Sequence, residues 1–145
     1  MTATAHTDSL TRILARTFRL YVQTHGYHWN VEGPEFRQLH GFFEEQYQEL
    51  WNSLDEIAER LRSLGAYAPA SLAEFLTLGG EEAAPAQSAA AMVDALIAGH
   101  DALAAELRAA IATAQEAGDE PSAGLLTDRL AWHEQQLWMM KASRK

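Results

Sequence analysis

Cysteine and long apolar runs are missing from this sequence, and each absence excludes a class of protein. The 145 residues include no cysteine, which excludes disulfide bonds, thiolate metal sites and cysteine nucleophiles. No apolar run approaches the roughly 20 residues that a membrane-spanning helix needs. The N-terminal segment also lacks the basic and then apolar pattern of a signal peptide. We therefore expect a soluble, cytoplasmic chain of one domain.

Lysine is also scarce, since the sequence contains only Lys141 and Lys145. The formal net charge is −9 at pH 7. An acidic surface repels phosphate backbones and attracts cations. The charge balance therefore disfavours general nucleic-acid binding and is compatible with a protein that handles metal ions.

Strand-like alternation and proline are scarce as well, whereas alanine is abundant and apolar residues recur at helical spacing. This pattern predicts four long helices, over residues 8–31, 34–64, 88–118 and 121–141. A capping-box sequence from Ser71 to Glu74 predicts a short helix over 71–78, which a linker over 81–87 follows. We expect a short polar tail over 1–8 and a short basic tail over 141–145.

The lengths of the connections predict how these helices pack. Tight turns near Gly33 and Gly118 join the first long helix to the second and the third to the fourth. A long connection that contains the short helix joins the second to the third. A four-helix bundle with one crossover is the ferritin-like arrangement. The sequence therefore predicts an all-α, ferritin-like four-helix bundle over residues 1–145.

Four potential metal ligands form one stripe on the helix predicted over 34–64. With His40 as the angular origin and about 100° per residue, Glu44, Asp55 and Glu59 follow at about 40°, 60° and 100°. The apolar stripe of the same helix centres roughly 110° away from the ligand stripe. The ligands therefore flank the bundle instead of filling its core.

The four ligands of this stripe cannot all bind one metal ion within a single chain. His40 and Asp55 are fifteen residues apart, or roughly 22 Å along a helix, whereas metal–ligand bonds are about 2.0–2.3 Å long. Either two poor sites form or two chains cooperate. If two copies pack antiparallel about a two-fold axis at the middle of the stripe, the His40 end of one chain faces the Asp55 end of the other. Trp51 would lie near that axis as an interface anchor.

His28 extends the set of candidate ligands. It precedes the predicted turn at Gly33 and His40 follows that turn, so a helical hairpin would bring the two histidines close together. Two imidazoles with three carboxylates form a mixed nitrogen and oxygen site. Such ligands suit iron, zinc or manganese, and ligand type alone does not choose among them.

The segment from His28 to His40, with the sequence HWNVEGPEFRQLH, closely resembles the Dps family of miniferritins. The match continues through Phe43-Glu44, through DEIAERL at 55–61, and through Leu64-Gly65. The spacings between the candidate ligands are those of the family. The resemblance implies a hollow dodecamer whose ferroxidase centres are shared between two-fold-related subunits.

The resemblance also implies a role for each candidate ligand. Iron would be bound by His28 and His40 of one subunit together with Asp55 and Glu59 of the next, and Glu44 would assist a second, weaker iron. Trp29 would lie beside this centre. The protein would oxidise Fe(II), with hydrogen peroxide preferred over dioxygen, and store ferric mineral, which protects against oxidative damage.

Family members also admit iron through acidic pores on three-fold axes. The region that lines such pores lies near the start of the last long helix. In this sequence it offers Asp119, Glu120 and Asp128 as candidate pore residues.

Two other functions stay open. The first is a DNA-compacting Dps protein, associated with the nucleoid, in which iron oxidation is secondary. Many members bind DNA through lysine-rich tails, but residues 1–11 contain no lysine or arginine and the C-terminal tail offers only Lys141, Arg144 and Lys145. We therefore do not favour DNA binding. The second is an enzyme with two metals in its own bundle core, a class that uses Glu-x-x-His pairs, and the sequence contains no such pair.

The remaining histidines have no comparable partners in the sequence. We interpret His25 as a core residue or a neighbour of the centre. His6, His100 and His133 are placed on the surface. Trp138 is interpreted as a packing residue.

Overall fold

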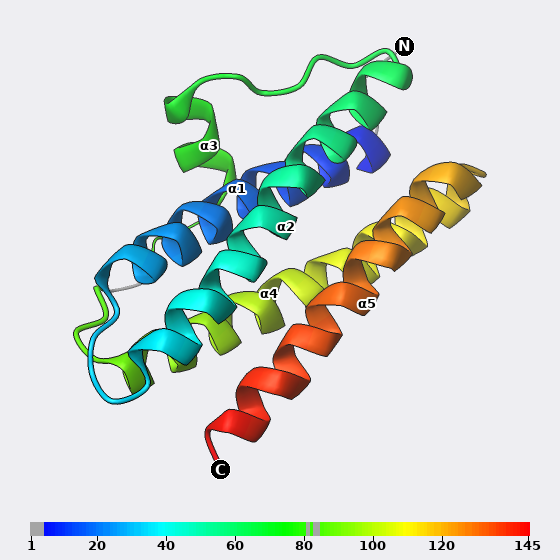
Figure 1. Cartoon of the computed structure of the whole chain (residues 1–145). Coiled ribbons are helices and arrows are strands. Elements are labelled where there is room, and N and C mark those ends of the chain that lie inside the picture. The colour runs from blue at the N-terminus through cyan, green and yellow to red at the C-terminus, as the bar shows by residue number, and fades with distance from the viewer. Residues whose placement is uncertain (1–4, 81, 83–84) are drawn as a thin grey trace.

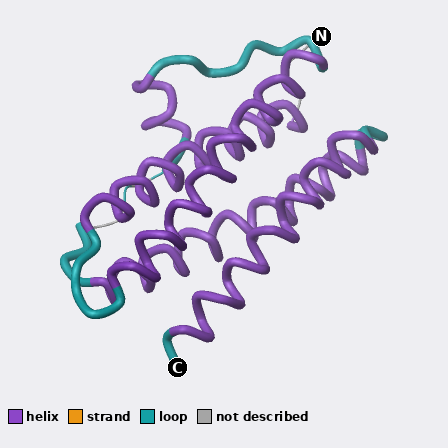
Figure 2. The backbone as a smooth tube through the Cα atoms, in the orientation of Figure 1, coloured by secondary structure: helices purple, strands orange, loops and turns teal. Residues whose placement is uncertain are grey.

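The computed structural model describes residues 5–80, 82 and 85–145, and every regular element in this part of the chain is a helix. Figure 2 shows the same residues as helices joined by loops. The four long helices are α1 (Ala5–Asn30), α2 (Phe36–Ser63), α4 (Ala89–Glu116) and α5 (Glu120–Ser143), and the short one is α3 (Leu72–Leu78). The predicted all-α, ferritin-like bundle is confirmed. Within the described residues, none of the helices has the length and apolar character needed to cross a membrane.

Two antiparallel hairpins make up the bundle. Figure 1 shows α1 beside α2 and α4 beside α5, with α2 and α4 running in the same direction. The chain must therefore cross back along the bundle between α2 and α4, and α3 lies in this crossover. The predicted capping box is present, because the Ser71 hydroxyl accepts from the Glu74 N–H at 3.2 Å and the Glu74 carboxylate accepts from the Ser71 N–H at 3.2 Å. Phe75 attaches α3 to α1 by stacking on Phe18, with ring centroids 4.5 Å apart.

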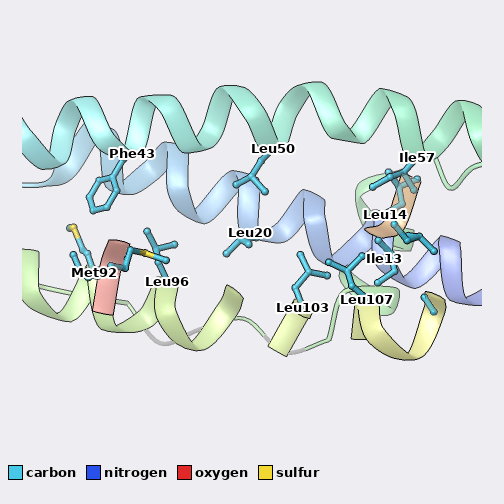
Figure 3. Packing of buried hydrophobic residues seen from close by; sticks show 14 of the residues in the cluster. Ile13, Leu14, Leu20, Phe43, Leu50, Ile57, Met92, Leu96, Leu103 and Leu107 are labelled. Carbon is cyan, nitrogen blue, oxygen red and sulfur yellow. The ribbon is translucent and has the colours of Figure 1, made fainter. Parts of the chain in front are cut away.

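The core lies between the four long helices, and α5 contributes Leu126 and Met140 to it. Figure 3 shows Phe43, Leu50 and Ile57 of α2 directed toward apolar side chains of α1 and α4. These three α2 residues recur every seven positions, which keeps them on one face of the helix. Each is at most 1% exposed. Burial of this stripe fixes the rotation of α2 and so turns the predicted ligand stripe away from the core.

Several boundaries differ from those predicted by one to three residues. α1 already begins at Ala5, so residues 5–8 are helical, and 1–4 lie outside the described residues. α2 begins at Phe36, which leaves Pro34 in the preceding turn. α5 continues to Ser143, so the predicted basic tail is largely helical and only its last residues lie beyond the helix. Residues 81, 83 and 84 of the predicted linker are also outside the described part.

Four side chains lie where the sequence interpretation did not place them. His6, His100 and His133 were expected on the surface but are 7%, 0% and 1% exposed. Trp138 was expected to pack but is 67% exposed. Each buried histidine has one polar partner outside its own helix, Asp119 for His6 and the other ring for His100 and His133, which removes part of the penalty for burying them.

Candidate metal centre

The turn between α1 and α2 brings His28 and His40 together. Gly33 takes a φ of 113°, a conformation that residues with a Cβ rarely adopt, and the chain reverses there. The two imidazole rings stack with centroids 3.8 Å apart and planes 14° from parallel. The predicted proximity of the two histidines is therefore present within one chain.

A reciprocal pair of hydrogen bonds fixes these two rings. Nδ1 of His28 lies 2.7 Å from the His40 carbonyl oxygen, and Nδ1 of His40 lies 2.7 Å from the His28 carbonyl oxygen. A carbonyl oxygen can only accept, so each Nδ1 must carry the proton and donate it. Each neutral ring then keeps its lone pair on Nε2. This is how metal-binding histidines are commonly held, with the second nitrogen bonded to a fixed acceptor.

Glu44 lies next to this pair. One carboxylate oxygen is 3.8 Å from Nε2 of His28, the nitrogen that is free to bind a metal. The Glu44 side chain is 48% exposed, whereas that of His28 is 9% exposed. A half-exposed carboxylate beside a buried imidazole can move onto a cation with little rearrangement of the backbone.

Asp55 and Glu59 lie farther along α2, on its exposed side. Neither carboxylate has a hydrogen-bond or ion-pair partner among the described residues. Because α2 is one uninterrupted helix, the separation of Asp55 from His40 is still roughly 22 Å. Within the described part of a single chain, no group of three or more metal-binding side chains comes together. A complete site made from these ligands therefore requires a second chain.

An aromatic cluster surrounds His28. The ring of His25 stacks on Tyr47 with centroids 3.8 Å apart, and the exposed ring of Trp29 lies 4.2 Å from His25. Burial, with a smaller contribution from His28, lowers the pKa of His25. Burial, with a smaller contribution from Tyr47, raises the pKa of Tyr21. The sequence interpretation placed His25 near the centre but missed this cluster, whose signal is the spacing of Tyr21, His25 and His28 along one face of α1.

The geometry can be compared with known proteins. A family model described as a ferritin-like domain matches residues 7–144. The DNA protection during starvation protein of Brevibacillus brevis is 40% identical over 134 residues, which cover 92% of this chain and 90% of that protein. The crystal structure of a Dps protein from Bacillus brevis matches with a TM-score of 0.93 at 37% identity, and covers 99% of this chain and 100% of that one. This chain belongs to the Dps family.

A second solved structure relates the Dps fold to its chemistry. The Dps protein of Vibrio cholerae O1 matches with a TM-score of 0.92 at 33% identity, and covers 97% of this chain and 89% of that one. It is described as a member of a broad superfamily of ferritin-like diiron-carboxylate proteins. Membership of this superfamily implies iron binding and supports an oxidoreductase function in general terms. The imidazole and carboxylate donors of this Dps chain suit ferrous iron, and no thiolate competes, because the sequence has no cysteine.

The candidate pore residues of this Dps chain differ in their surroundings. Asp119 caps the N-terminus of α5, where it accepts from the Ser122 N–H at 3.1 Å and pairs with Arg60 at 2.8 Å and His6 at 2.7 Å. Burial alone would raise the pKa of Asp119, but these hydrogen bonds and the charge of Arg60 hold it well below its usual range. The Asp119 carboxylate therefore stabilises the fold through these contacts. Glu120 and Asp128 are exposed on α5 and remain the stronger pore candidates.

A second histidine pair was missed entirely. Nδ1 of His100 on α4 lies 2.9 Å from Nδ1 of His133 on α5, and both rings are buried. Burial lowers the pKa of both, and the charge of Arg129 lowers them further. These rings stay neutral and share a hydrogen bond inside the bundle.

Proposed function

We propose that this chain is a cytoplasmic ferroxidase and iron-storage miniferritin. It oxidises Fe(II) at centres shared between two-fold-related subunits and stores ferric mineral in a hollow dodecamer, which protects the cell against oxidative damage. The observation that carries this proposal is the reciprocal bonding of His28 and His40. Both Nδ1 atoms are occupied by backbone carbonyls, so both Nε2 atoms are available to a cation.

In this proposal, two chains supply the ligands of each centre. His28 and His40 hold a ferrous ion from one side, and the partner subunit's Asp55 and the partner subunit's Glu59 close the site from the other. Glu44, 3.8 Å from Nε2 of His28, binds the second ferrous ion. Because Asp55 and Glu59 are exposed and have no side-chain partner among the described residues, assembly brings them to the metal without breaking a described contact.

Hydrogen peroxide is the preferred oxidant in this proposal. Two ferrous ions give one electron each to one peroxide molecule, which takes up two protons and becomes two water molecules. A lone ferrous ion would give only one electron and release a hydroxyl radical. Holding two ions at one centre therefore removes peroxide without forming the radical.

Mixed oligomers test whether the centre is shared. We expect His28→Ala and Asp55→Ala to be nearly inactive as separate oligomers. When they are unfolded together, refolded and verified as mixed by mass spectrometry, each His28→Ala/Asp55→Ala pair contains one intact centre. Random mixing in equal amounts should then restore about one quarter of the wild-type rate of Fe(II) oxidation.

The matched control mixes His28→Ala with His40→Ala. Both substitutions fall on the same side of the centre, so no intact centre can form and no recovery is expected. No recovery in either mixture would favour a site within one chain, and normal oxidation by the separate variants would refute the ligand assignment. A crystal soaked in Fe(II), with anomalous scattering at the iron edge, identifies the ligands and the chain that supplies each.

DNA binding is the second candidate, because the Brevibacillus brevis relative is named a DNA protection during starvation protein. Two basic groups near the C-terminus are already paired, Arg144 with Asp94 at 2.8 Å and Lys141 with Asp101 at 3.6 Å. In a gel-shift assay we expect retardation that is weak at low salt and absent at physiological salt. Retardation that persists at physiological salt would make DNA binding the better description.

A further inference from the structure

A cavity of about 710 Å³ opens between α1, α3 and α4. Its lining residues come from α1, from α3 and the segment that follows it, and from α4. His28 and the candidate metal ligands on α2 do not line it. Sites for small molecules typically measure about 300–1,000 Å³ and are mostly apolar, with a few polar groups that orient the ligand. The cavity is therefore a candidate binding site separate from the candidate metal centre.

Short side chains on α4 keep this cavity open. The α4 wall consists of residues that recur three, four and seven positions apart and so share one face of the helix: Ala95, Ala98, Gly99 and Ala102. A Cβ at Gly99 would come within 3.0 Å of Leu20 Cδ1 on α1, so the two helices approach closely at the floor. Leu72 and Leu76 of α3 and Val22 of α1 also line the cavity and are 71%, 57% and 51% exposed. A ligand that covered these side chains would remove apolar surface from water, which favours an apolar ligand body.

Arg19 lies at one end of the cavity, and its guanidinium is held in place. Nη1 donates to the carbonyl oxygens of Gly79, at 2.8 Å, and of Gly80. Both acceptors are uncharged, and no carboxylate pairs with Arg19 among the described residues. Arg16 also lines the cavity, but its Nε lies 2.7 Å from a carboxylate oxygen of Glu106. The charge of Arg19 is therefore available to an anion, whereas that of Arg16 is already neutralised.

The two glycines that follow α3 determine which side of the Arg19 guanidinium stays free. A Cβ at Gly79 would collide with Cδ of Arg19, so only glycine lets the arginine side chain cross the chain at this point. Because Nη1 uses its two N–H groups on Gly79 and Gly80, Nε and Nη2 remain as an edge with two parallel donors. A carboxylate can accept from such an edge through both of its oxygens. The bound loop thus presents a carboxylate-binding edge at the end of an apolar cavity.

We propose that this cavity binds a fatty acid, with the carboxylate on the Nε–Nη2 edge of Arg19 and the acyl chain along the α4 wall. Tyr27 lines the far end, eight residues or roughly 12 Å along α1, a distance that a medium-length acyl chain spans. The Tyr27 hydroxyl already accepts from the Gln23 amide at 3.0 Å, so the far end requires no second polar group on the ligand. Exposed Glu82, which also lines the cavity, would repel a second carboxylate. A ligand with one carboxylate and an unbranched apolar chain therefore fits best.

Isothermal titration calorimetry of the metal-free oligomer tests this proposal without any iron chemistry. Octanoate, decanoate and dodecanoate, each below its micelle concentration, should bind once per chain, and each added methylene should tighten binding by up to about fourfold. Arg19→Gln should weaken binding of dodecanoate by about tenfold or more and leave binding of the neutral dodecanol unchanged. The matched control is Arg12→Gln, because Arg12 is an exposed arginine of α1 outside the cavity, and it should bind dodecanoate as wild type does. Equal affinity of wild type and Arg19→Gln for dodecanoate would overturn the proposal.

A second pair of variants tests the acyl-chain site. Ala98→Trp places a large ring in the cavity and should abolish dodecanoate binding, whereas Ala109→Trp alters an exposed position of α4 outside the cavity and should not. Circular dichroism and mass photometry verify that both variants keep the wild-type fold and assembly. Equal binding by both variants would show that dodecanoate adheres elsewhere and would overturn the proposal. Absence of binding to the wild-type oligomer would show that a second copy of the chain covers the cavity, and would overturn it as well.

Discussion

His28 and His40 form one close pair of histidines and His100 and His133 form another, and the two pairs use their ring nitrogens in opposite ways. In the first pair each Nδ1 donates to a backbone carbonyl at 2.7 Å. In the second pair the two Nδ1 atoms face each other at 2.9 Å. One Nδ1 must then donate its proton to the other, so each ring uses its Nδ1 for the contact between them.

The hydrogen-bond acceptor decides what each pair can do. A carbonyl acceptor fixes the ring and leaves Nε2 free, and Nε2 of His28 points to the half-exposed Glu44. The His100–His133 pair is sealed inside the bundle, where Nε2 of His100 has no partner among the described residues. The first pair is thus prepared for a cation, and the second is a neutral contact that joins α4 to α5.

One substitution in each pair gives the largest expected difference between the two pairs. We expect His28→Ala to slow Fe(II) oxidation by about 100-fold or more, since loss of a mere outer partner of a ligand already costs about 10–100-fold. His133→Leu should leave the oxidation rate unchanged and lower the stability of the subunit. Stopped-flow oxidation and urea unfolding measure the two effects. Equal slowing in both variants would remove the distinction between the pairs.

Acid should weaken the buried pair. Burial and Arg129 lower the pKa values of His100 and His133 in the folded chain below the value of about 6.5 that holds in the unfolded chain. The unfolded chain therefore binds more protons as the pH falls through 6.5, so the stability that is present above this pH is lost below it. At pH 5 the loss approaches about 2 kcal/mol for each histidine.

Urea unfolding at pH 7 and pH 5, at one fixed protein concentration, measures this loss. The double variant His100→Leu/His133→Leu serves as the control, and its stability should depend much less on pH in this range. Asp119 contributes little here, because its pKa is depressed in the folded chain and its carboxyl is ionised above pH 5 in the unfolded chain as well. The same pH dependence in the double variant and in wild type would show that other groups cause the acid sensitivity.

Removing one member of the buried pair should cost more than removing both. In His133→Leu the His100 ring keeps a buried Nδ1 without a partner, which costs about 1–3 kcal/mol. The double leucine variant leaves no such atom and should be nearly as stable as wild type. A double-mutant cycle of unfolding free energies measures the difference. Strictly additive losses would mean that the two rings do not depend on each other.

Periodicity and turn chemistry explain how much of the fold could be predicted. The apolar stripe of α2, the capping box at Ser71 and the connection lengths determined the bundle and its crossover. The ligand stripe followed from the same helical wheel, because Asp55 and Glu59 face away from the core. These features depend on residues that are close in sequence.

The failures concern contacts between distant segments. His100 is four residues after Leu96 and three before Leu103, so its spacing already indicated burial, but the sequence interpretation placed it on the surface because it had no comparable partner in the sequence. A buried histidine is stable only with a partner, and that partner lies on another helix. Asp119 was a candidate pore residue, and the sequence did not indicate that its carboxylate pairs with Arg60 and His6. Contacts between different segments determine the roles of His100 and Asp119. The periodicity of one helix does not predict such contacts.

A substitution in the turn between α1 and α2, which positions His28 and His40, should have a smaller effect. Gly33 has a φ of 113°, so Gly33→Ala should destabilise the folded chain by about 1–2 kcal/mol even though a Cβ would meet no atom within 4 Å. The strain falls on the turn that sets the reciprocal His28–His40 bonds, so the affinity for Fe(II) should fall as well. Gly124→Ala is the matched control, because Gly124 also has open space around it but is helical, and alanine there should be neutral or slightly stabilising. Anaerobic Fe(II) titration and urea unfolding measure both effects. A Gly33→Ala variant with reduced stability but wild-type affinity would mean that the two rings keep their geometry without the turn.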